Sequence, residues 1–343
     1  MRHFTRLADL GPAGMQQVFD KALASKKQAP GAGLSGKLLG MVFFNPSLRT
    51  RASFEAAMLR SGGHAIVLEV GGGVWKLEDR KGAVMNSDRP EHIREAIPVL
   101  GRYVDALAVR TFAALADDDA DAADPVINAF RELAGVPVIS MESAREHPCQ
   151  GLADLLTIRE NFGTTRALPV TLVWAPHIKP LPKAVPHSFL LTAAAAGCEL
   201  RIAHPPGFDL HPEVLAEARQ YAAQSGGSVS VTHDPKAALA SSRVVYAKSW
   251  GPASNSAPAG EAATRITAHS DWLVNGKTLA AAAQNAIFLH CLPVRRNVEV
   301  ADEVLDGPHS RVIDEAENRL HVQRVLLHDL LNQKKEIRRV HIA

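Results

Sequence analysis

The chain has 343 residues, of which 46% are hydrophobic and 22% are charged, and its formal net charge is +2. This length is typical of two domains, and this composition is typical of a globular protein rather than a disordered one. The near balance of basic and acidic residues gives no reason to expect a nucleic acid or an anionic membrane as partner.

Two further features indicate where such a protein resides. The N-terminal segment has no apolar run typical of a secretion signal, and no stretch approaches the roughly 20 apolar residues of a membrane-spanning helix. The three cysteines, Cys149, Cys198 and Cys291, match neither a disulfide framework nor a zinc site. We therefore expect a cytoplasmic protein that binds no metal.

Apolar runs alternate along the chain with helix-like segments. This alternation predicts an α/β fold of parallel sheets with helices on both faces, and continuous apolar runs such as VTLVW are typical of strands buried on both sides. In chain order, the expected strands are residues 38–44, 65–69, 106–109, 136–140, 170–174, 199–203, 229–232, 244–247 and 287–290, and the expected helices are residues 50–61, 91–103, 125–134, 151–161, 189–196, 212–224 and 318–332.

The expected strands fall into two sets, which predicts a domain boundary near residue 150. One set ends with the run at 136–140, and the next begins with the run at 170–174. We therefore predict a first domain at residues 1–150 and a second at residues 151–317, with a C-terminal helix at 318–335 that packs on the first domain.

The segment after the first expected strand has the features of an anion site. An apolar run leads to Ser47, and a helix is expected to begin within residues 48–50. A helix N-terminus presents free N–H groups and a partial positive charge to an anion. The hydroxyls of Ser47 and Thr50 and the guanidinium of Arg49 are suited to bind phosphate. The alternative is an ordinary helix capped by Ser47, with arginines that face solvent.

Three motifs together resemble those of one enzyme family. The run Ser-Leu-Arg-Thr-Arg at residues 47–51, followed by Ser-Phe-Glu, is similar to the carbamoyl phosphate site of the aspartate/ornithine carbamoyltransferases. His-Pro-Cys-Gln at 147–150 and His-Cys-Leu-Pro at 290–293 are similar to two further elements of that family, in the same order. The resemblance spans nearly the whole chain. It implies an enzyme of two doubly wound parallel-sheet domains, of which the first binds carbamoyl phosphate and the second binds the amine acceptor.

The resemblance also implies a mechanism. A neutral amine attacks the carbonyl of carbamoyl phosphate, a tetrahedral oxyanion forms and phosphate leaves, so the protein positions the reactants and stabilises charge. No metal, cofactor or covalent enzyme intermediate is required. The residues implied to bind carbamoyl phosphate are Ser47, Leu48, Arg49, Thr50, Trp75, Arg110, His147, Gln150, Leu292 and Arg295, of which Arg49, His147 and Arg295 are implied to be catalytic.

Individual contacts in this set follow from the same resemblance. His147 would polarise the carbonyl oxygen, the Gln150 side chain and the Leu292 carbonyl would hold the carbamoyl NH2, and Arg295 would stabilise the oxyanion. An alternative for His147 is a helix-entry residue whose imidazole is satisfied within the protein. Cys291 is implied to line the substrate site without acting as a nucleophile, because no activating base is apparent in the sequence.

The resemblance further implies an oligomer. In the family, active sites are shared between the subunits of a trimer, and Trp75 occupies the position that would reach the neighbouring subunit. We therefore expect a homotrimer with shared active sites. The alternative is that Trp75 anchors its own loop, residues 71–89.

The acceptor is expected to be an ornithine whose α-nitrogen is acylated. Ornithine carbamoyltransferases carry an acidic D-x-x-x-S-M-G loop that pairs with the α-ammonium, whereas here the corresponding segment is Tyr-Ala-Lys-Ser-Trp. A lysine there would repel an ammonium and pair with a carboxylate. The chain also resembles the N-acetylornithine and N-succinylornithine carbamoyltransferases. The residues implied to bind the N-acylornithine are Pro90, Glu142, His177, Lys248, Cys291, Leu292 and Arg295, with Glu142 as partner of the δ-ammonium.

Two positions bear on the acyl group. Acetyl-specific enzymes carry a glutamate where this chain has Pro90, and succinyl enzymes carry proline there, so we favour N-succinylornithine. An alternative for Pro90 is an ordinary proline in the first turn of the expected helix 91–103. Glu299 stands near the position of a lysine that the acetyl enzymes can carboxylate, which keeps N-acetylornithine open. The alternative for Glu299 is an exposed acid at a helix start.

Two interpretations from other classes are weaker. A non-catalytic protein of this fold would not need Arg49, His147, Gln150 and Arg295, all of which are present. A dinucleotide-dependent dehydrogenase would need Gly-x-Gly-x-x-Gly between a strand and a helix, and the three glycines at 71–73 are not followed by a convincing helix.

Overall fold

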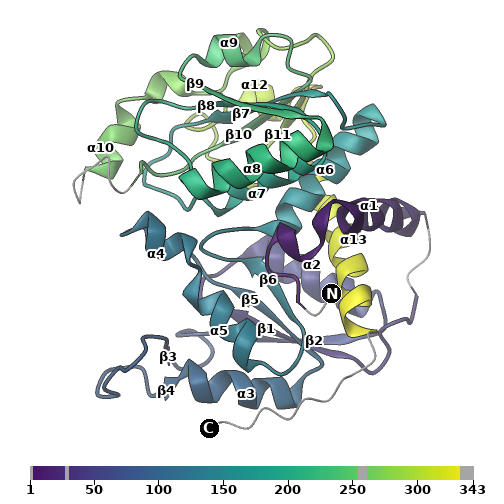
Figure 1. Ribbon diagram of the computed structural model, residues 1–343, viewed down its shortest axis with the longest axis vertical. Helices are drawn as coiled ribbons and strands as arrows, with labels where there is room; N and C mark the ends of the chain where they lie inside the picture. The colour runs from purple at the N-terminus through teal and green to yellow at the C-terminus, as the bar shows by residue number, and fades with distance from the viewer. Residues whose placement is uncertain (1–2, 28–30, 254–260, 333–343) are drawn as a thin grey trace. The chain divides into compact units, whose positions relative to one another are not determined.

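The computed structural model describes residues 3–27, 31–253 and 261–332 (Figure 1). The chain forms two compact units. Unit 1 comprises Met1–Phe112, Ala123–Cys149 and Arg319–Ala343, and unit 2 comprises Ala113–Ala122 and Gln150–Asn318. Each unit is described by itself.

Unit 1 contains a four-stranded sheet in the order β2-β1-β5-β6. Every neighbouring pair in it is parallel, as the continuous apolar runs predict. The order reverses between β1 and β5, which is the mark of a doubly wound sheet. The strands are β1 (Leu38–Phe43), β2 (His64–Glu69), β5 (Ala106–Arg110) and β6 (Val138–Glu142).

Helices cover both faces of this sheet (Figure 1). Helices α3 (Ile93–Tyr103) and α5 (Pro125–Leu133) pack on one face, where Ile97 and Phe130 join strand residues such as Val109 in one apolar cluster. Each such buried side chain contributes about 1.5–3 kcal/mol of hydrophobic stabilisation. The other face carries α1 (Gly11–Lys26), α2 (Leu48–Leu59) and the part of α13 (Val312–Leu331) that begins at Arg319; the earlier residues of α13 belong to unit 2.

Unit 2 contains a five-stranded sheet in the order β11-β10-β7-β8-β9, again with parallel neighbours. Its order reverses between β7 and β10. The expected fold class, two doubly wound parallel-sheet domains, is therefore confirmed. The strands are β7 (Pro169–Trp174), β8 (Glu199–Ala203), β9 (Ser228–Thr232), β10 (Val244–Lys248) and β11 (Ile287–Leu289).

The second sheet is also covered on both faces. Helix α7 (Ala184–Ala195) is mostly apolar, and every one of its residues is buried. Phe189 of α7 stacks on Tyr246 of β10 with ring centroids 4.1 Å apart. The further helices of unit 2 are α4 (Asp118–Ala122), α6 (Pro148–Phe162), α8 (Pro212–Ser225), α9 (Pro235–Leu239), α10 (Ala262–Thr267), α11 (Gly276–Leu279) and α12 (Asp302–Leu305); α6 begins with the last two residues of unit 1.

The structure differs from the sequence expectations at several element ends. Helix α7 begins at Ala184 rather than near 189, because Pro186 lies in the first turn, where its missing N–H breaks no helical hydrogen bond. Helix α13 begins at Val312, six residues before the expected start at 318. Helix α1 was not expected. Short additional elements are η1 (Leu7–Asp9), η3 (Ser270–Trp272) and a two-stranded sheet of β3 (Leu77–Glu78) and β4 (Glu91–His92).

The segment Ala113–Ala122 lies outside the expected second domain but belongs to unit 2. Its helix α4 is held there by two carboxylates. Lys183 Nζ donates to Asp118 at 2.7 Å, and His211 Nε2 lies 3.0 Å from Asp119 Oδ1. The assignment of one domain to each substrate stays a proposal.

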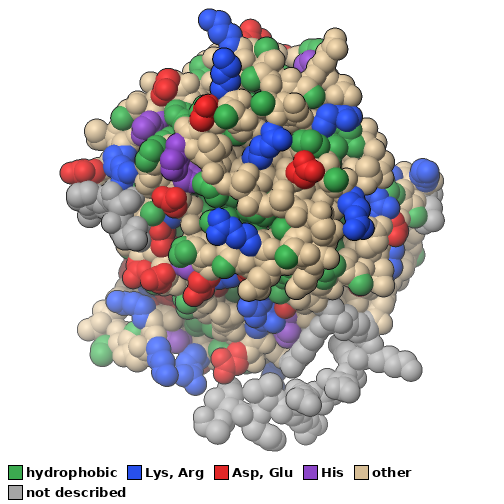
Figure 2. Space-filling model, turned by 45° about the horizontal axis from the view of Figure 1, so that its top comes forward, with side chains coloured by type: hydrophobic (Ala, Val, Ile, Leu, Met, Phe, Trp, Pro, Cys, Tyr) green, Lys and Arg blue, Asp and Glu red, His purple; other side chains and the backbone are tan. Residues whose placement is uncertain are grey.

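On the face drawn in Figure 2, basic and acidic side chains are interspersed. This mixture agrees with the small net charge of the chain. No helix among the described residues is long and apolar enough to cross a membrane.

Candidate active site

The carboxyl ends of β1, β5 and β6 lie at one edge of the unit 1 sheet. In doubly wound folds, ligands bind at this edge, next to the point where the strand order reverses. Arg110 is the last residue of β5, Glu142 is the last residue of β6, and Ser47 follows β1. His147 follows β6 and is buried. The topology therefore brings four predicted residues to one edge.

Helix α2 begins at this edge. Ser47 is its N-cap, and the Ser47 hydroxyl accepts a hydrogen bond from the Thr50 N–H at 3.3 Å. The Leu48 side chain is 82% exposed. The alternative of solvent-facing arginines is correct for Arg51, which pairs with Glu69 at 2.7 Å, but not for the half-buried Arg49.

Three arginines near the start of this helix, Arg49, Arg110 and Arg319, act electrostatically on the buried His147. Burial, and then the charges of Arg319, Arg110 and Arg49, hold the pKa of His147 well below its usual 6.5. Burial, followed by Arg110, lowers the pKa of Arg319 to about 10. The guanidinium of Arg319 also donates to Thr50 Oγ1 at 2.8 Å. Such a convergence of like charges stabilises a bound anion strongly, because little solvent screens it.

Glu142 is the carboxylate of this cluster. Arg110 Nη1 donates to Glu142 Oε2, and His147 Nε2 lies 3.8 Å from the same oxygen. Glu142 offsets only part of the positive charge, since three guanidinium groups act on His147. His147 directly precedes helix α6, as the helix-entry alternative requires, and it also lies among charged groups.

In unit 2, the carboxyl ends of β7, β10 and β11 again lie at one edge, beside the reversal of strand order. Lys248 is the last residue of β10, His177 follows β7, and His290 follows β11. All three side chains are buried. The edge therefore carries two of the residues predicted for the acceptor, His177 and Lys248.

Arg295 joins His177 at this edge. Arg295 Nε donates to His177 Nε2 at 3.0 Å. Since the guanidinium only donates, His177 carries its proton on Nδ1, which then donates to the Lys179 carbonyl at 2.9 Å. Burial lowers the pKa of His177, which favours this neutral form.

Glu299 is part of this edge, so its interpretation as an exposed acid is wrong. Its side chain is 1% exposed, and it accepts from the Arg295 N–H at 2.7 Å. Burial raises the pKa of Glu299, but the nearby His290 imidazole, 3.7 Å away, and the charge of Lys248 outweigh burial and lower the pKa to about 2. Glu299 is therefore a fixed negative charge beside Lys248. Among the described residues, the Lys248 ammonium has no hydrogen-bond partner.

The loop after β11 has an unusual backbone. Leu292 has φ 54°, a left-handed conformation that costs a non-glycine residue about 1–2 kcal/mol. The Leu292 N–H donates to His290 Nδ1 at 2.9 Å, which helps hold this conformation. Cys291 is buried beside it. The loop thus has a defined shape, which suits a backbone carbonyl that contacts a ligand.

Trp75 and Pro90 lie in the part of unit 1 that contains β3 and β4. The Trp75 side chain is 61% exposed, and its indole N–H donates to Glu91 at 2.7 Å. Helix α3 begins at Ile93, because His92 is its N-cap and accepts from the Arg94 N–H. The interpretation of Pro90 as a first-turn proline is therefore wrong, since Pro90 precedes strand β4.

Sequence reasoning missed Arg319, which no motif contains. One signal was present: Glu315, Arg319 and Val322 fall on one buried stripe of α13, where apolar residues are expected.

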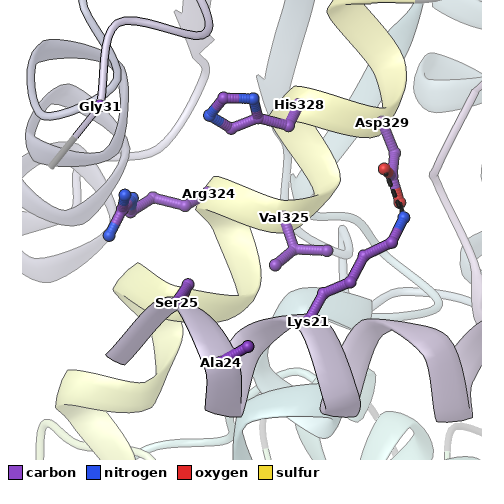
Figure 3. A pocket seen from close by; sticks show the side chains of 8 residues that line it. All are labelled: Lys21, Ala24, Ser25, Gly31, Arg324, Val325, His328 and Asp329. Carbon is purple, nitrogen blue, oxygen red and sulfur yellow. Dashed lines mark hydrogen bonds and ion pairs between the residues drawn. The ribbon is translucent and has the colours of Figure 1, made fainter. Parts of the chain in front are cut away.

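A separate cavity of about 380 Å³ in unit 1 lies between α1 and α13. Figure 3 shows the residues that line it, among them Arg324, His328 and the ion pair of Lys21 with Asp329. It is lined by no predicted site residue.

Two doubly wound parallel sheets and a positively charged site at a sheet edge define an α/β protein of the kind that binds small anions at strand ends. The family profile "Aspartate/ornithine carbamoyltransferase, carbamoyl-P binding domain" matches residues 2–160, and the profile "Aspartate/ornithine carbamoyltransferase, Asp/Orn binding domain" matches residues 182–330. The chain belongs to the aspartate/ornithine carbamoyltransferase family.

Relatives within the family are similar over most of their length. The chain is 41% identical to the N-acetylornithine carbamoyltransferase of Xanthomonas campestris, with 98% of this chain and 99% of that protein covered. It is 42% identical to the N-succinylornithine carbamoyltransferase of Bacteroides thetaiotaomicron, with 82% and 84% covered.

A solved structure is equally similar. It is a glutamate-to-proline variant of N-acetyl-L-ornithine transcarbamylase complexed with carbamyl phosphate and N-succinyl-L-norvaline. It superposes with a TM-score of 0.93 at 41% identity, with 96% of this chain and all of that chain (100%) covered.

Proposed function

We propose that the protein transfers the carbamoyl group of carbamoyl phosphate to the δ-amine of an N-acylated L-ornithine, with N-succinyl-L-ornithine favoured. The products are N-acyl-L-citrulline and phosphate, and the reaction serves arginine biosynthesis. The observation that carries the proposal is the cluster of Arg49, Arg110 and Arg319 around the buried His147. It is suited to the phosphate of carbamoyl phosphate and to charge that develops in the reaction.

The phosphate of the donor is bound by residues of unit 1. The N–H groups at the start of α2 and the side chains of Ser47, Arg49 and Thr50 hold the phosphate, with Arg110 as a further contact. His147 is neutral at pH 7, because its pKa is held below 6.5, and it donates a hydrogen bond to the carbonyl oxygen. Arg295 stabilises the oxyanion after the amine attacks.

The charged groups of the acceptor are the groups that the protein binds. Lys248 pairs with the α-carboxylate, His177 contacts the carboxylate or the acyl group, and Glu142 pairs with the δ-ammonium before it loses its proton. The Lys248 side chain is 7% exposed, and its ammonium has no hydrogen-bond partner among the described residues, which supports a carboxylate ligand. An unacylated ornithine would place a second ammonium near Lys248, which disfavours it.

Two observations bear on the acyl group. Pro90 stands where acetyl-specific relatives carry glutamate, and a glutamate-to-proline variant of an acetylornithine enzyme was crystallised with a succinyl ligand. Loss of that negative charge favours a succinyl carboxylate. The second candidate, N-acetylornithine carbamoyltransferase, is favoured by Glu299, a buried negative charge beside Lys248.

We also propose a cytoplasmic homotrimer with shared active sites. The exposed indole of Trp75 supports a contribution to a neighbouring subunit. Light scattering after size exclusion should give three times the chain mass. Mixing Trp75→Ala with Arg49→Ala should restore activity that neither variant has alone, because hybrid trimers then contain intact sites.

The test of the function is a comparison of three amines at equal concentration: N-succinyl-, N-acetyl- and unmodified L-ornithine. Purified protein and carbamoyl phosphate should release phosphate and form an N-acylcitrulline, fastest with N-succinylornithine. A higher kcat/KM for N-acetylornithine would select the second candidate. Phosphate release at the background rate with all three amines would refute a carbamoyltransferase.

A further inference from the structure

The side-chain amide of Gln150 is held by two buried carboxylates. Gln150 Nε2 donates to Asp154 Oδ1 at 2.7 Å and to Glu315 Oε1 at 3.2 Å. All three side chains are at most 1% exposed. Because carboxylates accept hydrogen bonds, they fix the amide with its nitrogen toward them. The Gln150 Oε1 atom is turned away and has no hydrogen-bond partner among the described residues.

Glu315 also holds the loop after β11. Its second oxygen, Oε2, accepts from the His290 N–H at 2.9 Å. His290 Nδ1 in turn accepts from the Leu292 N–H at 2.9 Å. One carboxylate therefore sets the orientation of the Gln150 amide and, through His290, the position of the Leu292 backbone.

We propose that Glu315, assisted by Asp154, is a positioning residue for the carbamoyl NH2 of the donor. This inference rests on the proposed function, together with Gln150 and the Leu292 carbonyl as the contacts to that NH2 that the family resemblance implies. An NH2 group offers two N–H donors, and Gln150 Oε1 and the Leu292 carbonyl are two acceptors. Glu315 helps to position both acceptors, although it does not itself touch the substrate. It therefore determines where the donor site can accept hydrogen bonds from the NH2.

A purely structural role makes a different prediction. A buried carboxylate that only stabilises the fold would, when altered, weaken every ligand alike or unfold the chain. A positioning role for the NH2 weakens carbamoyl phosphate but not ligands that lack the NH2. Acetyl phosphate has a methyl group in that place, and inorganic phosphate has no acyl group at all, so these two compounds separate the roles.

The test uses the full-length Glu315→Gln variant. The new amide can accept from only one of the two donors, since its NH2 must face the other. We expect kcat/KM for carbamoyl phosphate to fall about 10- to 100-fold. We expect the inhibition constants of acetyl phosphate and inorganic phosphate to change less than threefold, so that the preference for carbamoyl over acetyl phosphate is largely lost. Glu317→Gln, on the exposed side of the same helix, is the matched control and should leave all constants unchanged.

An unchanged preference for carbamoyl over acetyl phosphate in Glu315→Gln would overturn the inference, as would an equal loss of affinity for all three phosphates. If Glu315→Gln does not fold, Glu315→Asp and Asp154→Asn receive the same measurements and are expected to lower the same preference. In a Gln150→Ala background, Glu315→Gln should have a smaller effect, because part of its action passes through Gln150. Wild-type protein without carbamoyl transfer would refute the proposed function instead.

Discussion

The guanidinium of Arg319, on α13, donates to the hydroxyl of Thr50, on the first turn of α2, at 2.8 Å. Both side chains are buried. The hydrogen bond joins the first turn of helix α2, the proposed phosphate-binding helix, to a residue 269 positions away in sequence. Arg319 thereby extends the site beyond the motif that first indicated it, and it brings a further positive charge close to His147.

Replacement of Arg319 by methionine should therefore weaken donor binding. Methionine fills similar volume but lacks the charge and the hydrogen bond to Thr50. We expect kcat/KM for carbamoyl phosphate to fall about 100-fold, the size of effect seen when one charge-stabilising donor is removed. Arg324→Met, on the same helix, is the matched control and should be near wild type. Steady-state kinetics with a saturating amine would measure both, and equal constants for the two variants would contradict the role of Arg319.

The pKa of His147 predicts a pH dependence of stability. The unfolded chain takes up a proton near pH 6.5, whereas the folded chain does so only at lower pH, because burial and three arginines hold the pKa of His147 down. Below pH 6.5 the unfolded state thus binds more protons, and the free energy of unfolding falls as the pH falls. Above about pH 7.5 this contribution is constant, because neither state then binds the proton.

We expect this loss to be about 1 kcal/mol between pH 6.5 and pH 5.5. His147→Gln cannot take up the proton, so its stability should fall by that much less over the same interval. Urea denaturation of ligand-free wild type and variant at both pH values measures the difference. Parallel pH profiles of the two proteins would show that His147 is not held neutral by the fold.

The part of the site that sequence predicted best is contiguous. The segment 47–51, proposed to bind phosphate, is an N-cap and a helix start, and these features depend on neighbours in sequence. The positions of the strands could be predicted equally well, because buried parallel strands are continuous apolar runs. The order of the strands, by contrast, is not in any local pattern, and it is known only from the structure.

The sequence alone could not predict contacts between residues that only folding brings together. Arg319 and Glu315 look like ordinary polar residues of a long helix until its buried stripe is known. For Glu299, the sequence left open an exposed acid at a helix start, yet packing places it beside His290. Pro90 looked like a helix start because helix α3 follows closely, and only the pairing of β3 with β4 moves that start to Ile93.

The identity of the acyl group should depend on the charge at residue 90. Pro90→Glu adds a carboxylate that would repel the second carboxylate of a succinyl group but not an acetyl group. We expect the ratio of kcat/KM for N-succinylornithine to that for N-acetylornithine to fall about tenfold, which corresponds to about 1.4 kcal/mol. Val84→Glu adds the same charge to the same loop and serves as the control. An unchanged ratio in Pro90→Glu would mean that residue 90 does not face the acyl group.

Lys248 should decide between acylated and free ornithine. Lys248→Met removes the charge that pairs with the α-carboxylate and that repels an α-ammonium, so the two amines should respond in opposite directions. We expect KM for the N-acylornithine to rise at least tenfold, the loss of one charged hydrogen bond, while the small activity with ornithine is unchanged or rises. KM for carbamoyl phosphate should stay within about twofold, since its proposed contacts do not include Lys248. Lys236→Met, on the exposed surface of unit 2, is the matched control. Steady-state kinetics with both amines would decide: if Lys248→Met lowers kcat/KM for ornithine and N-acylornithine by the same factor, the lysine supports the fold of the site and does not select the acceptor.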